Sequence, residues 1–175
     1  MKFQIGDACF LAFINEETIK LRIQELALEI EPHLNSENTL IIGILDGATH
    51  FHSDLCRCFQ QDYKIAFIKA SSYHGMHSTG KVQLSIGDTD YHDQHILIVE
   101  DIVDSGKTLE LILSFLWGKG AATIKIVSLL FKPETFSANF NLDYVGFTIP
   151  DRYVIGYGMD CDGRGRNLRD IYILE

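Results

Sequence analysis

The sequence predicts an α/β fold, in which a mostly parallel β-sheet is flanked by helices on both faces and a small hood is built from the two ends of the chain. Three observations predict this. Short apolar runs rich in β-branched residues, typical of strands buried on both faces, alternate with amphipathic helical patterns as far as Phe131. These runs are followed by small or polar residues where a strand would end. From Phe136 onward, the pattern changes to short aromatic-rich pieces separated by Gly and Pro.

The chain has the size and composition of one globular domain. It contains 175 residues, of which 46% are hydrophobic, and carries a net charge of −9. We expect a single domain over residues 1–175, with the core at about 15–131 and the hood at about 1–14 plus 132–175. The acidic balance argues against a nucleic-acid or anionic-membrane surface. No signal peptide or long apolar span is recognisable, which favours a cytoplasmic protein.

The first half of the predicted core contains a helix, a strand and a second helix. Asn15, followed by two glutamates, is a favourable helix start, and apolar residues then recur at helical spacing until Pro32. The apolar run 39–45 predicts a strand, and a helix follows it through Phe59. The small-residue turn 46–48 joins the two, which makes it a candidate phosphate loop.

A polar insertion follows the next strand, which is predicted at residues 65–70. Residues 71–80 contain Ser, Gly and two histidines, and apolar residues alternate again from Val82 to Ile86. Long polar loops in compact domains are often lids over a site. His74 and His77 lack a third metal ligand nearby, which favours exposed loop histidines over a metal site.

The most informative stretch is residues 95–108, His-Ile-Leu-Ile-Val-Glu-Asp-Ile-Val-Asp-Ser-Gly-Lys-Thr. A buried strand is followed at once by Glu100 and Asp101, in the region where ligands of open α/β sheets bind. The turn 104–108 then leads into a helix predicted at 109–116, and such a turn offers free N–H groups to a phosphate. Carboxylates repel a bare phosphate, but they accept hydrogen bonds from ribose hydroxyls and coordinate Mg²⁺. The stretch therefore predicts a phosphorylated sugar with a magnesium-bound pyrophosphate.

Two other interpretations of this stretch are less favourable. Gly106-Lys107-Thr108 looks like the end of a nucleoside-triphosphate loop, but the position five before Gly106 is Asp101 rather than Gly. A loop that only caps a helix would not need three carboxylates so close together after a buried strand.

Residues 99–108 resemble the phosphoribosyl-pyrophosphate (PRPP) motif of the type I phosphoribosyltransferases, and more narrowly of the hypoxanthine-guanine phosphoribosyltransferases. The resemblance covers nearly the whole chain and implies the type I phosphoribosyltransferase fold, Mg²⁺ as cofactor, and a homodimer or homotetramer. The residues matched to PRPP binding are Glu100, Asp101, Asp104, Ser105, Gly106, Lys107 and Thr108. Asp104 is the candidate general base at purine N7, and the two preceding carboxylates would position the ribose hydroxyls directly or through Mg²⁺.

The resemblance also implies pyrophosphate and lid positions. At residues 45–48 the family carries a Leu-Lys-Gly-Gly or Leu-Lys-Gly-Ala loop, with a cis peptide bond before its second residue. Asp46 stands here in place of Lys, so the backbone N–H groups of Asp46 and Gly47 are the expected contacts. Arg166 matches the pyrophosphate-binding arginine, although residues 161–165 depart from the family's usual Tyr-Asn-Glu-Tyr-like stretch. Ser72 and Tyr73 match the pair that opens the mobile catalytic loop.

The hood carries the implied purine site. Lys132 follows the strand predicted at 122–131 and matches the lysine that contacts the oxygen at purine position six. Tyr153 matches the aromatic residue that stacks on the base, and Val154 matches the residue whose backbone reads the purine edge. Asp160 matches the hood carboxylate near metal and base, so the implied metal ligands are Glu100, Asp101 and Asp160.

The implied reaction is transfer of 5-phosphoribosyl from PRPP to hypoxanthine or guanine, giving IMP or GMP plus pyrophosphate. We expect small-molecule partners, with no nucleic acid and no membrane. Two alternatives stay open. One is a non-catalytic regulator of the same fold that binds nucleic acid, which the acidic balance disfavours. The other is transfer to another base such as xanthine, which Lys132 and Tyr153 disfavour.

Overall fold

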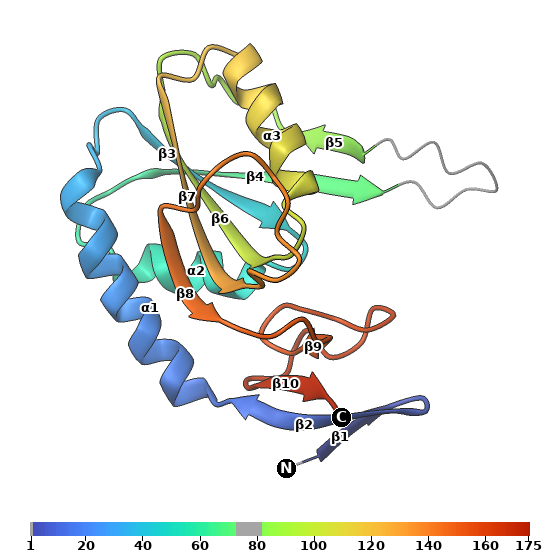
Figure 1. Cartoon of the computed structure of the whole chain (residues 1–175). Coiled ribbons are helices and arrows are strands. Elements are labelled where there is room, and N and C mark those ends of the chain that lie inside the picture. Colours follow the sequence, from blue (N-terminus) through green and yellow to red (C-terminus); the bar gives the residue numbers. More distant parts are fainter. Residues whose placement is uncertain (1, 73–81) are drawn as a thin grey trace.

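The computed structural model describes residues 2–72 and 82–175. Its larger sheet has six strands in the order β5-β4-β3-β6-β7-β8 (Figure 1). These strands are β3 (Thr39–Leu45), β4 (Lys64–Ser72), β5 (Val82–Ile86), β6 (His95–Val103), β7 (Thr123–Phe131) and β8 (Tyr144–Thr148). All of them run parallel except β5, which is antiparallel to β4. The predicted α/β class with a mostly parallel sheet is confirmed.

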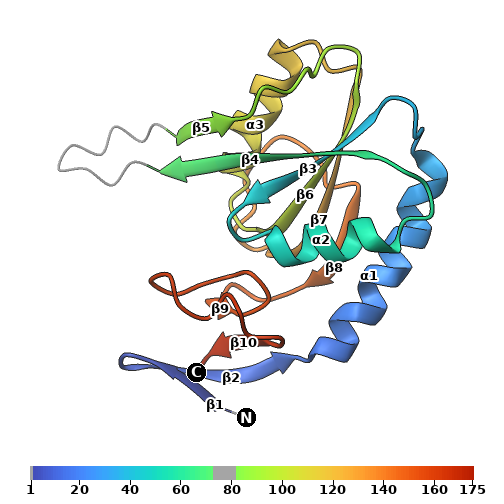
Figure 2. The ribbon, with the colours of Figure 1, turned by 180° about the vertical axis from the view of Figure 1, so that it is seen from behind.

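Helices cover both faces of this sheet, as the alternating pattern predicts. On one face lie α1 (Glu16–Ile30), continued by the short helix η1 (Glu31–His33), and α2 (Thr49–Cys58); α3 (Lys107–Gly118) lies on the other (Figures 1 and 2). The start of α1 is the predicted one, because the side chain of Asn15 accepts a hydrogen bond from the Thr18 N–H at 2.8 Å. The apolar stripe of α1 is buried in the core: Ile19, Ile23, Leu26, Ala27 and Ile30.

The two ends of the chain form a second sheet, the hood, which is antiparallel and has the strand order β1-β2-β10-β9. Its strands are β1 (Lys2–Ile5), β2 (Ala8–Ile14), β9 (Val154–Ile155) and β10 (Ile171–Leu174). Figure 1 shows β8 running toward the hood, so the hood lies beside the edge at which the parallel strands end.

The position of β8 differs from the expected division, which assigned residues 132–175 to the hood. β8 pairs in parallel with β7, with Tyr144 opposite Val127, and so belongs to the larger sheet. The Arg22 side chain on α1 donates to the carbonyls of Val145 at 3.0 Å and Gly146 at 3.1 Å, which ties β8 to the helix layer. β8 therefore extends the parallel sheet by one edge strand before the chain enters the hood.

Close contacts join the hood to the core, among them two at residues 157 and 158. The Tyr157 hydroxyl donates to the Asp54 carboxylate on α2. Gly158, with φ +103°, lies so close to the loop after β3 that a Cβ on it would be 2.0 Å from the Gly47 carbonyl oxygen. Within residues 2–72 and 82–175, no helix has the length and apolar character to span a membrane.

Candidate active site

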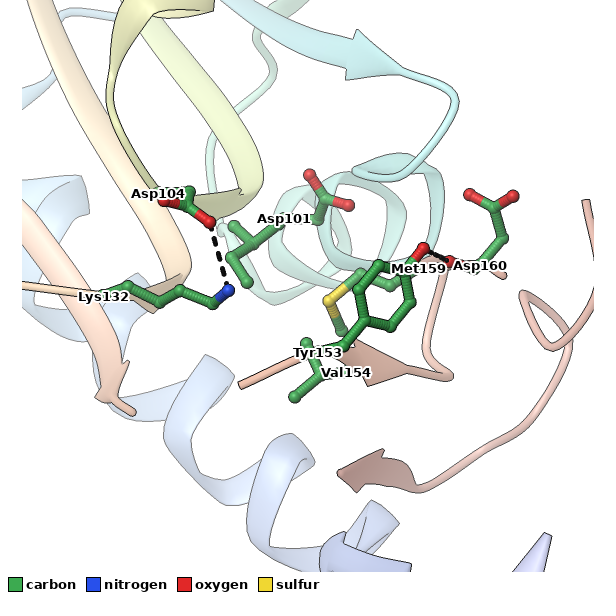
Figure 3. Close-up of a pocket in the computed structure, with 8 residues that line it drawn as sticks. Asp101, Asp104, Lys132, Tyr153, Val154, Met159 and Asp160 are labelled. Carbon is green, nitrogen blue, oxygen red and sulfur yellow. Dashed lines mark hydrogen bonds and ion pairs between the residues drawn. The ribbon is translucent and has the colours of Figure 1, made fainter. Parts of the chain in front are cut away.

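Two adjacent cavities lie where the parallel strands end and the hood begins. The larger, of about 230 Å³, is lined by Asp101, Ile102, Asp104, Lys132, Tyr153, Val154, Met159 and Asp160 (Figure 3). The smaller, of about 110 Å³, is lined by Glu100 and residues 102–109. Because both cavities are lined by Ile102 and Asp104, one elongated ligand can occupy them together. Their position outside the carboxyl ends of parallel strands is the usual ligand position in this class of sheet.

The smaller cavity contains the open start of α3. Gly106 occupies the N-cap with φ 82°, and no side chain caps the helix. The first N–H groups of a helix have no acceptor within it and lie at the positive end of its dipole. Ser105, Lys107 and Thr108 line the same cavity. The structure thus brings the residues of the predicted phosphate cradle together.

Glu100 and Asp101, which we call the acidic pair, precede this turn. The Glu100 side chain is buried, and its Oε1 accepts a hydrogen bond from the Asp101 N–H at 3.2 Å. Burial, together with the charge of Asp101, raises the pKa of Glu100 well above its usual range. Burial also raises the pKa of Asp101. Crowded carboxylate oxygens of this kind are the donors that a hard divalent cation prefers, so the acidic pair fits Mg²⁺.

The third carboxylate of the expected metal set, Asp160, is engaged within the hood. One of its oxygens pairs with Arg166 at 2.7 Å, and the other accepts the Gly163 N–H at 2.7 Å. Over residues 2–72 and 82–175, no three metal-ligating side chains form a cluster. The structure therefore brings Glu100 and Asp101 together but does not add Asp160 to them.

Arg166 is a hood residue whose charge reaches the acidic pair. Besides its ion pair with Asp160, it donates to the Gly158 carbonyl at 2.7 Å. Its positive charge lowers the pKa of Asp101, against the larger effect of burial. This guanidinium thus lies near enough to act on Asp101, and its planar donors suit a pyrophosphate.

The loop after β3 reaches the acidic pair from the other side. The Leu45–Asp46 peptide bond is cis, as the resemblance implies. A Cβ on Gly47 would lie 1.8 Å from Asp101 Oδ2, so glycine is required for the backbone to come this close. The Asp46 carboxylate is instead paired with Lys69 on β4 at 2.9 Å, and both side chains are about half exposed.

Lys132 carries the buried cation of the larger cavity. Its Nζ lies 3.1 Å from Asp104 Oδ2 and 3.2 Å from Asp151 Oδ1, and Figure 3 shows the ammonium group turned toward Asp104. The hydroxyl of Thr135 and the charge of Lys132 lower the pKa of Asp104, so this carboxylate stays ionised into the acidic range.

Tyr153 and Val154 form the hood side of the larger cavity. Both line the cavity together with Met159, and the Tyr153 hydroxyl donates to the Asp160 carbonyl at 2.9 Å (Figure 3). The Leu174 N–H donates to the Tyr153 carbonyl at 2.9 Å. Hydrogen-bonded and non-bonded positions alternate in an antiparallel pair, so Val154 takes a non-bonded position opposite Ile173. Because β9 is an edge strand, the Val154 N–H and C=O are left facing away from β10.

The sequence-based prediction missed several residues of this site. Ile102 and Met159 line the larger cavity, Asp151 pairs with Lys132, and Thr135 acts on Asp104. Ile102 lies within the recognised motif but has the appearance of a core residue. Asp151 and Met159 lie in the hood segment already matched to the purine site, beside Tyr153 and Asp160, but neither carries a local signal of its own, and Thr135 lies outside every recognised motif.

The predicted lid, residues 71–80, lies mostly outside the described residues. Ser72 is the last residue of β4. Tyr73 lies outside the described residues, as do His74 and His77.

Comparisons with known proteins agree with this geometry. The family described as "Phosphoribosyl transferase domain" matches residues 13–162. A hypoxanthine phosphoribosyltransferase of Buchnera aphidicola is 43% identical over 151 residues, covering 84% of this chain and 85% of the relative. A hypoxanthine-guanine phosphoribosyltransferase of Aquifex aeolicus is 38% identical over 165 residues, covering 93% of each. The crystal structure of a hypoxanthine-guanine phosphoribosyltransferase from Bacillus anthracis has a TM-score of 0.86 at 37% identity, covering 98% of this chain and 100% of that one. The chain therefore belongs to the phosphoribosyl transferase domain family.

Proposed function

We propose that this protein is a purine-salvage enzyme that transfers the 5-phosphoribosyl group of PRPP to hypoxanthine or guanine and releases pyrophosphate. The observation that carries the proposal is the pair of adjoining cavities. One holds an uncapped helix start and carboxylates, and the other holds a buried lysine and an aromatic ring. A nucleotide has the matching parts in the same order, namely a phosphate, a ribose and a base. The names of the Buchnera and Aquifex relatives support the choice of base.

The phosphosugar would occupy the smaller cavity. Its 5-phosphate would accept hydrogen bonds from the N–H groups and hydroxyls of residues 105–108. The acidic pair would hold the ribose hydroxyls. The same carboxylates would hold Mg²⁺, which would supply Lewis-acid stabilisation of the charge on the leaving pyrophosphate. Gly47 and Arg166 would bind the pyrophosphate from the core and from the hood. Ser72 and Tyr73 are proposed to begin a lid that keeps water from the activated sugar.

The purine would occupy the larger cavity. Its ring would stack on Tyr153, its 6-oxygen would accept a hydrogen bond from Lys132, and its edge would meet the free backbone groups of Val154. Asp104 lies between the two cavities. The proposed reaction breaks the bond between sugar carbon 1 and the pyrophosphate oxygen, and the electron pair leaves with pyrophosphate. N9 of the purine bonds to that carbon while its N7 proton passes to the Asp104 carboxylate.

An activity assay tests the proposal directly. Purified protein is given PRPP, Mg²⁺ and one of hypoxanthine, guanine, xanthine or uracil, and pyrophosphate release is measured. We expect turnover with hypoxanthine or guanine, and a lower rate with xanthine. Turnover with uracil only, or with none of the four bases, would contradict the proposal. We also propose that the protein is cytoplasmic. We propose that it is a homodimer or homotetramer, which light scattering of the purified protein would test.

A further inference from the structure

Three neighbouring strands of the sheet each carry a charged side chain just beyond their carboxyl ends. Lys132 follows β7, the middle strand of the three. Asp104 follows β6 on one side, and Asp151 lies shortly after β8 on the other. The Lys132 N–H donates to the Val103 carbonyl at 2.9 Å, which fixes the lysine backbone beside the start of the Asp104 loop. The order of the strands therefore places one cation between two anions.

The burial of these groups is unequal. The Lys132 side chain is only 8% exposed, whereas those of Asp104 and Asp151 are 50% and 49% exposed. An ammonium group with so little access to water needs a counter-ion, because leaving a buried charge unpaired is costly. Lys132 has two, at 3.1 and 3.2 Å. Only one of them, Asp104, is assigned a role in the proposed reaction.

The proposed reaction would neutralise that first counter-ion. When Asp104 accepts the N7 proton, its carboxylate loses its charge, and its ion pair with Lys132 becomes an ordinary hydrogen bond. Asp151 takes no part in the proton transfer, so its charge stays beside the ammonium group throughout. It can therefore keep the Lys132 ammonium group directed toward the base at every stage.

We infer that Asp151 is a positioning residue that holds the Lys132 ammonium group toward the 6-oxygen of the purine, and thereby contributes to the choice of 6-oxopurines. This inference rests on the proposed function, since it takes the purine to lie in the larger cavity. Asp151 does not itself contact the substrate. It acts through Lys132, whose hydrogen bond to the 6-oxygen has no counterpart in a purine that lacks this oxygen.

Nucleotide binding tests the inference because it separates recognition of the 6-oxygen from general effects on the fold. Dissociation constants are measured calorimetrically for IMP and for purine ribonucleoside 5′-monophosphate, which has hydrogen at position six. The variants are Asp151→Asn, which keeps the shape of the side chain and removes its charge, and Asp62→Asn as a control. Asp62 is an exposed carboxylate before β4, at the opposite end of the strands.

We expect Asp151→Asn to weaken IMP binding about 10- to 100-fold, which is the range for a charged hydrogen bond, and to change binding of the 6-unsubstituted nucleotide by less than about threefold. The control should bind both nucleotides as the wild type does. The intact affinity for the second nucleotide would also show that the variant is folded. In the enzyme assay, the same variant should raise the KM for hypoxanthine more than it lowers kcat.

Equal losses for both nucleotides would overturn the inference, because they would indicate a structural role. Unchanged IMP binding would overturn it as well. If the wild type binds IMP and forms it from hypoxanthine while Asp151→Asn behaves like wild type, the inference alone fails. If the wild type does not bind IMP, both the inference and the proposed function fail.

Discussion

Replacing Asp104 with asparagine tests the proposed chemistry most directly. The change removes the proton acceptor and leaves the size of the side chain nearly unchanged. It should cost little stability, because the Asp104 side chain is 50% exposed and Lys132 retains Asp151 as a counter-ion at 3.2 Å. A positioned general base contributes about 10²- to 10⁴-fold to the rate, which corresponds to about 3–5 kcal/mol of transition-state stabilisation. We therefore expect kcat to fall by about two to four orders of magnitude.

The effect on substrate binding should be much smaller. The groups proposed to bind the 5-phosphate are backbone N–H groups and hydroxyls at residues 105–108, and those proposed to bind the base are Lys132 and Tyr153. The asparagine variant keeps all of them. We expect KM for both substrates to change by less than about fivefold, because an interaction made only in the transition state lowers kcat and kcat/KM together.

Single-turnover kinetics are the appropriate assay. Enzyme in excess is mixed with PRPP and labelled hypoxanthine, and the rate of IMP formation is measured in a quench-flow instrument, so that slow product release does not hide the chemical step. Asp62→Asn serves as the control for loss of one negative charge. A chemical rate equal to that of wild type would refute the role of Asp104 as a base. A loss confined to KM would refute it too, since it would indicate a binding role.

Three further predictions concern individual contacts of the site. Thr135→Val removes the largest cause of the lowered Asp104 pKa. Because the base form of Asp104 is present above this pKa, the acidic limb of kcat/KM against pH should move to higher pH. An unmoved limb would contradict the assignment of Asp104 as the base. Gly47→Ala would place a Cβ 1.8 Å from an oxygen of the acidic pair and should weaken PRPP binding by about tenfold or more, as measured by calorimetry. The control is Gly118→Ala, whose Cβ meets nothing within 4 Å and which should bind PRPP normally. Tyr153→Leu should raise the KM for hypoxanthine about 10- to 100-fold through lost stacking, while Tyr153→Phe should stay near wild type; similar values for the two variants would argue against stacking.

The phosphate side of the site could be predicted because its residues are contiguous. Residues 100–108, which run from the end of β6 to the start of α3, carry the acidic pair, Asp104 and the helix start, and each part has a local signal in the sequence. A strand of apolar residues, a carboxylate at its end and a glycine before a helix are all recognisable without knowing what packs against them. The structure brings Glu100 and residues 102–108 together around one cavity, while Asp101 lines the adjoining one.

The base side could be predicted only in part, because its residues meet through the order of the strands. The contact between Lys132 and Asp151 exists because β7 and β8 are neighbours in the sheet. The local sequence around either residue does not predict this contact. The same limit explains why β8 was assigned to the hood. As an edge strand, it is only partly buried along most of its length and lacks the continuous apolar run that marks the central strands.

Asp46 stands where the resembled family carries Lys, and the charges around it explain how a carboxylate is tolerated there. An unpaired carboxylate here would repel a pyrophosphate, but Lys69 lies 2.9 Å from it and neutralises the loop. The N–H groups of Ala48 and Thr49 already donate within the turn, to the carbonyls of Ile44 and Asp46. The loop is therefore left with the N–H groups of its first two residues for a ligand, and we expect most of the positive charge for the proposed pyrophosphate to come from Arg166 and the proposed Mg²⁺. The net charge of −9 is therefore compatible with the proposed polyanionic substrate, because the attraction would be supplied locally by a few groups while the rest of the surface stays acidic.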